Sequence, residues 1–221
     1  MRSDESQFWD ERFKHEGTIW GDTPSATATT ALRYVPANSR VLEIGFGYGR
    51  DLAFMLRQGY RMSGIDLSVE ARHRTEARLQ RAGLQAEQLL TGSFEESNHR
   101  DILFDGVLSH RMAHLLITDD AVERFVRTVK SVLRAGGLLC MAVRNSKDVN
   151  PSETRLVQGN VYEYLPRPGH WIRFWDDEDL RRAFGKWFDF LTLDHVCELE
   201  SGARPVPCYL TVMVAQRSPA A

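Results

Sequence analysis

Short apolar runs alternate with longer amphipathic stretches along much of the chain, a pattern that predicts buried strands separated by helices. The apolar run 41–44 predicts a buried strand, which stops at three glycines on alternate positions. A helical pattern then runs from Asp51 to Gln58 and ends before Gly59. Strand, glycine turn and helix together bring bare backbone N–H groups and a helix N-terminus up to a bound ligand.

The same patterns divide the rest of the chain. Residues 60–68 predict a second strand that ends at Asp66, and the helix after Thr118 is predicted to end at Gly136-Gly137. Residues 147–171 show no clean periodicity and predict a long irregular loop, which could serve as a lid and acceptor pocket. Further helices are predicted over 23–34, 70–82 and 176–184, and further strands over 86–91, 105–109, 138–143, 188–196 and 208–215.

The details of the glycine turn limit the choice of ligand. Arg50 stands where the dinucleotide fingerprint requires its third glycine. Asp66 lies at the tip of the second strand, where an acid hydrogen-bonds the hydroxyls of a ribose. The pattern therefore favours a nucleoside ligand without bridging phosphates over a nicotinamide dinucleotide.

Four motifs carry a resemblance to a known family. Residues 41–51 and 64–68 resemble motifs I and II of class I S-adenosylmethionine-dependent methyltransferases. Residues 104–110 are similar to that fold's fourth-strand motif, and residues 133–141 to the turn into its fifth strand. The chain looks closest to the small-molecule branch that contains tellurite-resistance and thiopurine methyltransferases. The resemblance implies an α/β, Rossmann-like, doubly wound sheet of seven strands, mostly parallel with an antiparallel C-terminal strand and with helices on both faces.

The length of 221 residues fits one domain, so we predict a single methyltransferase domain over residues 1–221. Within it, we expect a cofactor-covering segment (1–35), a cofactor-binding core (36–145), a lid and acceptor-pocket insertion (146–175), and a terminal helix with a strand pair (176–217).

The resemblance implies S-adenosylmethionine as cofactor and S-adenosylhomocysteine as product. It assigns the ribose to Asp66, the ammonium end of the cofactor to Glu43, and a position bordering the cofactor to Trp20. Relatives carry Asn where Asp51 stands, and an acid would repel the methionine carboxylate, so Arg50 or the backbone is expected to take that contact. The predicted cofactor-binding residues are Trp20, Glu43, Gly45, Phe46, Gly47, Gly49, Arg50, Asp66, Leu67, Ser93, Phe94, Ser109 and His110.

Histidines near the ends of the later elements are the candidates for catalysis. Methyl transfer is a direct displacement, and a hydroxyl or acidic-carbon acceptor needs a base, whereas a thiol, selenol or neutral amine acceptor needs none. We predict His110 and His170 as catalytic candidates, with base assistance left open. His110 and His114 lack a third ligand nearby, so no metal site is predicted. The predicted acceptor-binding residues are His114, Arg144, Tyr162, Tyr164 and Trp171, although for Arg144 an ion pair at the rim is favoured over an anchor for an acidic acceptor.

Composition narrows the class of protein. A net charge of −2 gives no electrostatic case for nucleic acid or for an anionic membrane. No apolar stretch approaches a membrane span, the polar start is no signal peptide, and the three cysteines show no metal spacing. We therefore predict a cytoplasmic enzyme, monomeric or homodimeric, that acts on a small-molecule acceptor.

Two alternatives stay open. A nicotinamide-dependent oxidoreductase is disfavoured by Arg50 and by the absence of a Tyr-x-x-x-Lys pair. A non-catalytic protein that kept the fold would often have lost Asp66 or a glycine of the turn, and this chain retains them.

Overall fold

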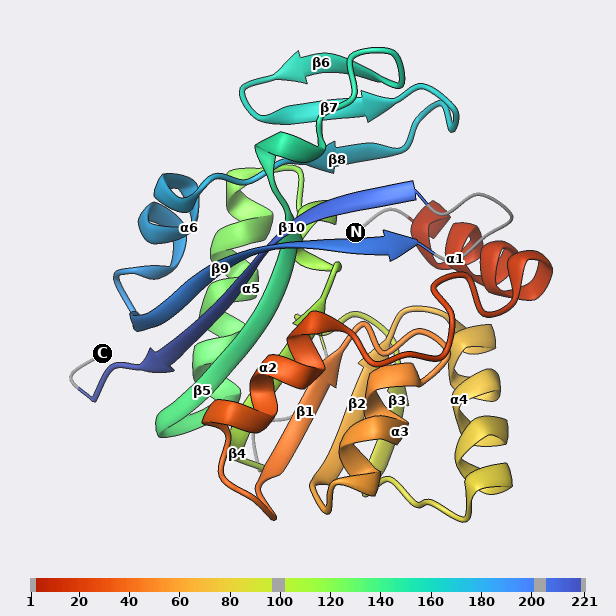
Figure 1. Cartoon of the computed structure of the whole chain (residues 1–221), viewed down its shortest axis with the longest axis vertical. Helices are drawn as coiled ribbons and strands as arrows, with labels where there is room; N and C mark the ends of the chain where they lie inside the picture. Colours follow the sequence, from red (N-terminus) through yellow and green to blue (C-terminus); the bar gives the residue numbers. More distant parts are fainter. Residues whose placement is uncertain (1–2, 97–101, 201–205, 220–221) are drawn as a thin grey trace.

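Seven strands form the large sheet of the computed structural model, which describes residues 3–96, 102–200 and 206–219. From edge to edge their order is β3-β2-β1-β4-β5-β10-β9 (Figure 1). The first five strands pair in parallel, and β10 pairs antiparallel to both of its neighbours. This arrangement confirms the predicted fold class. The strands are β1 (Arg40–Ile44), β2 (Arg61–Asp66), β3 (Gln88–Thr91), β4 (Phe104–His110), β5 (Leu133–Arg144), β9 (Phe188–Glu200) and β10 (Val206–Arg217).

The strand order reverses at β1, which lies between β2 and β4. Val41 pairs with Met62 on one side and with Gly106 on the other. In open α/β sheets, ligands bind outside the carboxyl ends of the strands at such a switch point. The glycine turn that follows β1 stands at this position.

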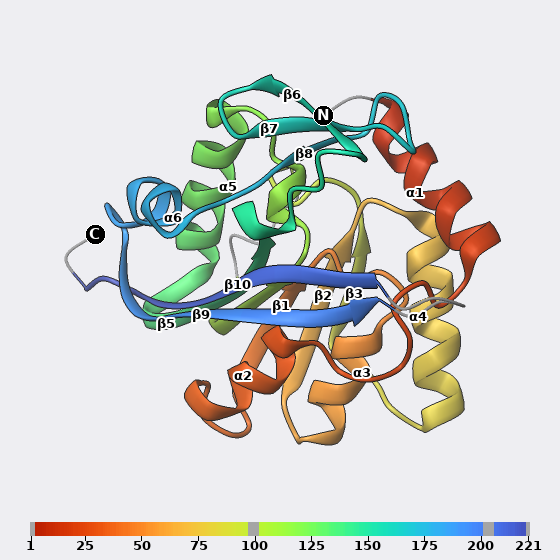
Figure 2. The same cartoon turned by 45° about the horizontal axis from the view of Figure 1, so that its top comes forward.

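Helices cover both faces of the sheet (Figure 2). Side chains alternate along β1, so Val41 packs in the core with one set of helices, while Leu42 and Ile44 pack with the other. The first set is α2 (Ala26–Tyr34), α3 (Arg50–Arg57) and α4 (Val69–Ala82), and the second is α5 (Asp119–Val132) and α6 (Asp177–Phe184). None of the described helices is long and apolar enough to cross a bilayer.

Polar caps fix where the helices begin. The side chains of Ser25, Ser68, Thr118 and Asp176 each accept a backbone N–H in the first turn of α2, α4, α5 and α6. Each such cap stabilises its helix by about 1 kcal/mol. The cap at Ser25 explains why α2 begins later than the predicted helix.

The predicted end of the helix after Thr118 is wrong. The structure ends α5 at Val132 and starts β5 at Leu133, so both glycines lie inside the strand. Gly136 has a φ of +73°, and a Cβ on Gly137 would lie 3.2 Å from the Asp105 carbonyl oxygen. The glycines therefore allow the register shift between β4 and β5. Leu133 continues the apolar spacing of the helix, which hid this boundary.

The insertion after β5 is a small antiparallel sheet rather than an irregular loop. It contains a short 3₁₀ segment, η2 (Ser146–Asp148), and the strands β6 (Thr154–Gln158), β7 (Val161–Tyr164) and β8 (Trp171–Arg173) in the order β6-β7-β8. These strands are short and β6 is mostly exposed, so they lack the apolar alternation that marks a half-buried strand.

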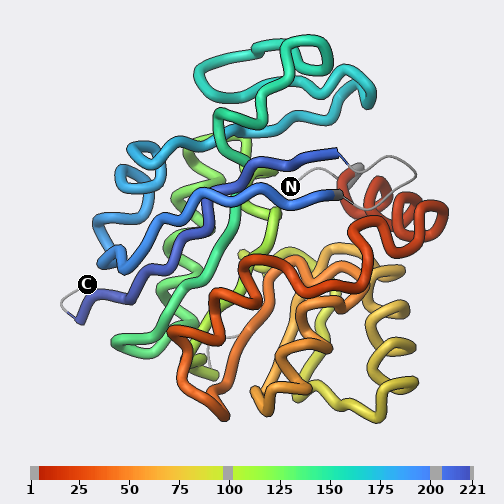
Figure 3. The backbone as a smooth tube through the Cα atoms, in the orientation of Figure 1, coloured from red at the N-terminus to blue at the C-terminus, as the bar shows by residue number. Residues whose placement is uncertain are grey.

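The chain begins with α1 (Ser3–Glu16), which packs beside α4. Asp10 Oδ1 accepts Ser68 Oγ at 2.5 Å and Glu70 N–H at 3.0 Å, which places a carboxylate at the N-terminus of α4. From α1 the chain runs past the ends of β1 and β2 to α2 (Figure 3). The N-terminal segment is thus fixed beside the carboxyl ends of the strands, where a ligand would bind.

Candidate active site

The glycine turn after β1 requires its glycines for two reasons. Gly45, Gly47 and Gly49 have φ values of +76°, +55° and +74°, which side chains rarely adopt. A Cβ on Gly49 would also lie 2.6 Å from Thr75 Cγ2, and one on Gly45 would lie 3.2 Å from Met112 Cβ. The conformation therefore disfavours a side chain at all three positions, and packing does so as well at Gly45 and Gly49.

Asp66 connects the turn to the end of β2. Its Oδ2 accepts the Gly47 N–H at 2.8 Å, and its Oδ1 accepts the Ser68 N–H at 2.9 Å. Burial raises the pKa of Asp66 to about 6, although the backbone hydrogen bonds act in the opposite direction. Asp66 is therefore mostly ionised at pH 7, and its remaining lone pairs can accept ligand hydroxyls.

Glu43 is a buried acid that lacks a full set of partners. The residue is 3% exposed, and its Oε2 has no hydrogen-bond partner among the described residues. Burial raises the pKa of Glu43 well above its usual value, and Asp51 and Asp66 raise it further, while Arg50 lowers it. Such a group is costly to bury, and a cationic or amine ligand would provide what it lacks.

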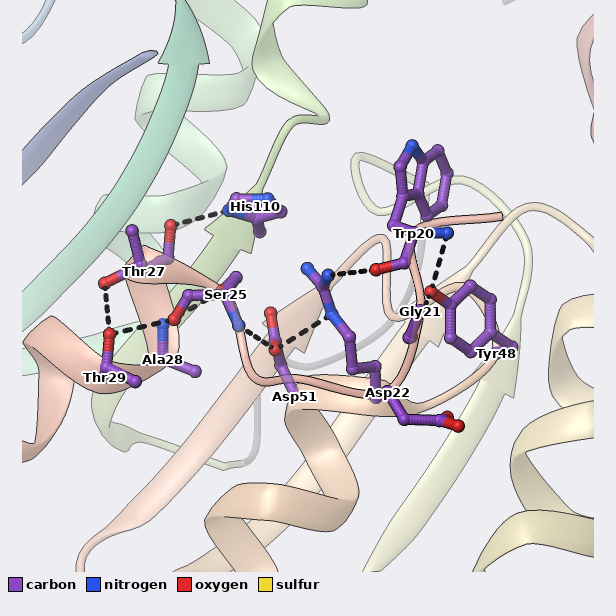
Figure 4. A network of polar contacts seen from close by, with 12 residues as sticks. Trp20, Gly21, Asp22, Ser25, Thr27, Ala28, Thr29, Tyr48, Asp51 and His110 are labelled. Atoms are coloured by element: carbon purple, nitrogen blue, oxygen red, sulfur yellow. Dashed lines mark hydrogen bonds and ion pairs between the residues drawn. The ribbon is translucent and has the colours of Figure 1, made fainter. Parts of the chain in front are cut away.

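The segment between α1 and α2 is held to the turn by hydrogen bonds (Figure 4). Tyr48 Oη accepts the Trp20 N–H at 3.0 Å and donates to the Gly21 carbonyl at 2.7 Å. The Trp20 ring stacks on the Tyr48 ring, with centroids 6.0 Å apart. Asp51 Oδ1 accepts the Ser25 N–H at 2.8 Å, so this acid positions the chain before α2. Trp20 is thereby brought beside the glycine turn.

His110 lies at the end of β4, and both of its ring nitrogens have partners. Thr27 Oγ1 is 2.9 Å from Nδ1, and Glu198 Oε2 is 3.3 Å from Nε2. Glu198 Oε1 also accepts the Ala26 N–H at 2.6 Å. Burial by itself would raise the pKa of Glu198, but His110 and the Ala26 N–H lower it to about 2. Glu198 was missed in the sequence, where it lies on a distant strand with no motif around it.

Ser109 and His114 are buried near His110. Ser109 Oγ and His114 Nδ1 have no hydrogen-bond partner among the described residues. Burial lowers the pKa of His114 well below its usual value, and the nearby Arg111 and Arg144 lower it further. His114 is therefore neutral at pH 7, and its Nδ1 is available to a ligand. It lies in the 3₁₀ segment η1 (Ala113–Leu115).

His170 contacts α1 from the turn between β7 and β8. Its ring stacks on Phe8 with centroids 5.3 Å apart and an interplanar angle of 20°, and Tyr164 meets the same ring edge-on at 6.4 Å. Burial, Arg12 and Arg167 lower the pKa of His170 to about 4, so the ring is neutral at pH 7. His170 therefore closes an aromatic contact between the insertion and the N-terminal helix.

Two other predicted acceptor residues lie apart from this contact. Tyr162 packs edge-on against Phe174, with centroids 5.4 Å apart. Trp171 is half-buried at the start of β8. Among the described residues, Tyr162 has no contact with His110 that would support a direct role.

Arg144 forms the ion pair that the sequence left as one of two alternatives. Its Nε donates to Asp148 Oδ2, while Asp148 Oδ1 accepts the Tyr209 N–H at 2.8 Å. Asp148 is buried and joins the end of β5 to β10. This acid was not singled out in the sequence.

The remaining predicted residues differ in what their side chains offer. Phe46 and Phe94 are buried in the core, so a ligand would meet their backbone. The Leu67 carbonyl accepts Ser6 Oγ at 3.0 Å, and Ser93 Oγ donates to Glu95 Oε2 at 2.8 Å. In the described part of the chain, no group of three or more His, Cys, Asp or Glu side chains could hold a metal ion.

Comparisons with known proteins agree with this geometry. Residues 41–137 match a family model described as a methyltransferase domain. A chain solved in work on the conversion of a disulfide bond into a thioacetal group during echinomycin biosynthesis is similar with a TM-score of 0.78 and 17% identity, over 98% of this chain and 94% of that one. A comparison with curated protein sequences gives no significant match.

Two further solved structures are similar over most of this chain. TehB from Haemophilus influenzae has a TM-score of 0.68 and 12% identity, over 95% of this chain and 67% of that one. The other is the 1,6-didemethyltoxoflavin-N1-methyltransferase of Burkholderia thailandensis, solved with bound 1,6-didemethyltoxoflavin and S-adenosylhomocysteine. It has a TM-score of 0.68 and 19% identity, over 97% of this chain and 84% of that one. The family model and these neighbours confirm the resemblance to S-adenosylmethionine-dependent methyltransferases.

Proposed function

Because the chain has the fold of the S-adenosylmethionine-dependent methyltransferases, we propose that it transfers a methyl group from that cofactor to a small-molecule acceptor. The observation that carries the proposal is Glu43, a buried acid with an unpartnered oxygen, beside Asp66 and the glycine turn. S-adenosylmethionine supplies a methyl group on a positively charged sulfur. A lone pair of the acceptor bonds to the methyl carbon as the carbon–sulfur bond breaks, which leaves the sulfur as a neutral thioether. A small-molecule acceptor is also the substrate class of the Burkholderia neighbour.

The residues at the switch point fit the parts of this cofactor. The glycines allow close approach to the backbone, and Asp66 accepts the ribose hydroxyls. Glu43 Oε2 accepts the ammonium group of the methionine part, which gives the buried acid its missing partner. Ser109 Oγ, equally buried and without a described partner, lies at the end of the next strand and is assigned to the same ligand.

Other predicted residues keep supporting roles in this proposal. Trp20 borders the ligand, because Tyr48 and Arg50 hold its backbone beside the turn. Arg50 is also 3.3 Å from Asp51, so its charge is shared between that acid and any cofactor carboxylate. Ser93, Leu67 and the backbones of Phe46 and Phe94 are assigned to the nucleoside end of the ligand.

His110 is the residue that we assign to a proton released by the acceptor. Both ring nitrogens have partners, so the proton travels through Thr27, whose hydroxyl gives its own proton to Nδ1 and takes the proton of the acceptor. Glu198 stabilises the positive charge that the ring gains. His170 is less suited to this role, because its pKa of about 4 makes it a weak base at neutral pH. The atom of the acceptor that receives the methyl group is O, N, S or C.

Isothermal titration tests the cofactor assignment directly. We expect S-adenosylmethionine and S-adenosylhomocysteine to bind the wild type with a Kd in the micromolar range, about −8 kcal/mol. Asp66→Asn should weaken both at least about tenfold, which is 1.4 kcal/mol. Asp120→Asn, at an exposed acid on α5, is the matched control and should bind as the wild type does. Absence of binding by the wild type to either compound would refute the proposal.

A further inference from the structure

Positively charged side chains from four separate elements gather beside the proposed methyl-transfer site. Arg12 comes from α1, Arg111 follows β4, Arg144 ends β5 and Arg167 lies between β7 and β8. We call these four residues, together with His114 and His170, the cationic cluster. Its members are neighbours in space, since Arg111 and Arg144 both act on the pKa of His114, and Arg12, Arg144 and Arg167 all act on that of His170.

Among the described acids, two form ion pairs with Arg12, Arg144 and Arg167. Glu16 is shared, because it lies 3.1 Å from Arg12 and 3.5 Å from Arg167. Asp148 pairs with Arg144. The pKa of Arg12 is lowered by burial, by Arg167 and by Arg111, and Glu16 offsets this in part. The guanidinium groups of Arg12, Arg144 and Arg167 thus meet two carboxylates of the described residues in a partly buried setting, where like charges repel strongly.

Two buried nitrogen atoms beside the cluster have no hydrogen-bond partner among the described residues. His114 is 6% exposed, and its Nδ1 has no hydrogen-bond partner among the described residues. The same holds for Trp20 Nε1, which can donate a hydrogen bond but cannot accept one. An incoming group with lone pairs and negative charge would satisfy these nitrogens and the surplus of positive charge together.

Flat aromatic surfaces lie among the same charges. The Trp20 ring has the guanidinium carbons of Arg111 and Arg12 at 5.4 Å and 5.6 Å from its centroid. Trp9 lies 5.3 Å from the Arg12 guanidinium carbon and 6.4 Å from Trp20, between ring centroids. A guanidinium that lies over a ring donates its hydrogen bonds in its own plane, and a planar oxyanion is bound by two parallel hydrogen bonds of this kind.

We propose that this enzyme's acceptor is a small aromatic acid that binds as its carboxylate anion. The carboxylate is received by Arg144 and by His114 Nδ1 in the tautomer that carries its proton there, and the ring of the acceptor lies with Trp9 and Trp20. This assignment rests on the proposed methyl transfer. The carboxylate of the cofactor is the competing explanation for the positive charge, so the test is made with that carboxylate already present.

Three probes of one size isolate the effect of charge. Benzoate, benzamide and benzylamine are titrated into the protein saturated with S-adenosylhomocysteine, and binding is followed by ligand-observed NMR. Benzoate should bind at least about tenfold more tightly than benzamide, and benzylamine should bind more weakly than either. Equal affinity of benzoate and benzamide, or no binding by benzoate, would overturn the proposal.

Variants locate the site that distinguishes the probes. Arg144→Gln and His114→Phe should each reduce the preference for benzoate to about threefold or less. Arg155→Gln, at an exposed arginine on β6 of the same small sheet, should leave the preference unchanged. His114→Phe retains ring volume and leaves the Arg144 pair with Asp148 intact, so it serves if Arg144→Gln does not fold. A preference that survives in the folded variants would contradict the assignment.

The same titrations separate this inference from the function on which it rests. Failure of S-adenosylhomocysteine to bind the wild type counts against methyl transfer itself. Normal binding of S-adenosylhomocysteine with no charge preference among the probes counts against the aromatic acid and leaves methyl transfer standing.

Discussion

The two sides of the proposed site are built from opposite chemistry. On the cofactor side, the turn after β1 offers three glycines without side chains and the acids Glu43 and Asp66. On the acceptor side, α1 and the small sheet offer the cationic cluster and aromatic rings. A ligand that is cationic at one end thus faces acids, and an anionic acceptor would face cations. The two sides can therefore bind a cofactor with a cationic end and an anionic acceptor next to each other.

The two sides also differ in how they are held in place. The cofactor side follows strands in the centre of the large sheet, where the backbone geometry leaves little freedom. The acceptor side depends on contacts between distant parts of the chain, such as Phe8 with His170 and Glu16 with Arg167. Substitutions should therefore affect folding most on the cofactor side.

The largest effect is expected from Gly49→Ala. The new Cβ would meet Thr75 Cγ2 at 2.6 Å in a residue whose φ is +74°, and clash and strain together should lower the free energy of unfolding by about 3 kcal/mol. Gly83→Ala is the matched control, since its φ is +64° but no atom lies within 4 Å, and it should cost about 1 kcal/mol. Urea denaturation measures both, and equal losses would show that close packing at the turn does not matter.

A smaller effect is expected where the terminal hairpin meets the site. Glu198→Gln removes a carboxylate that holds His110 and the Ala26 N–H, and should lower the free energy of unfolding at pH 7 by about 2 kcal/mol. The folded pKa of Glu198 is depressed to about 2, so its contribution is present above its usual pKa and is lost as the pH falls through the folded value.

Denaturation at several pH values tests whether the stabilisation by Glu198 is lost as the pH falls. The difference between the wild type and Glu198→Gln should shrink as the pH falls from about 5 toward 2. Glu123→Gln is the control, because Glu123 pairs with Arg127 at the surface and should change stability by less than about 0.5 kcal/mol. A difference that stays constant over the acid range would mean that Glu198 acts through packing rather than through charge.

The difference between the two sides explains what could be predicted from the sequence. Gly45, Gly49 and Asp66 could be predicted from the sequence, because a turn and the end of a strand depend on a few consecutive residues. Glu198 and Asp148 acquire their partners only through pairing of strands that are far apart in the sequence. No periodicity marks such contacts, so they required the structure.

The same reasoning accounts for the errors in secondary structure. Residues 133–137 follow a strongly periodic helix, and the apolar Leu133 extended that pattern across the true boundary. The small sheet pairs with itself rather than with the core, so its strands need little apolar alternation. Local pattern predicts elements that face a core and fails where tertiary pairing decides the structure.

The smallest effect, and the sharpest comparison of the two sides, is expected from pH. A ligand that needs ionised Asp66 should lose affinity as the pH falls through its pKa of about 6, by about tenfold between pH 7 and pH 5. Benzoate bound at the cationic cluster should keep its affinity over the same range, because the arginines stay charged and the pKa of His170 lies near 4. Titration of S-adenosylhomocysteine and benzoate at pH 5, 6, 7 and 8, roughly spanning that pKa, measures both. Asp66→Asn should remove the part of the first profile that is centred near the pKa of Asp66 and leave the second profile unchanged, because the asparagine has no proton to release in this range. Parallel profiles for the two ligands would mean that one set of ionisable groups serves both, and the division into an acidic and a cationic side would then be wrong.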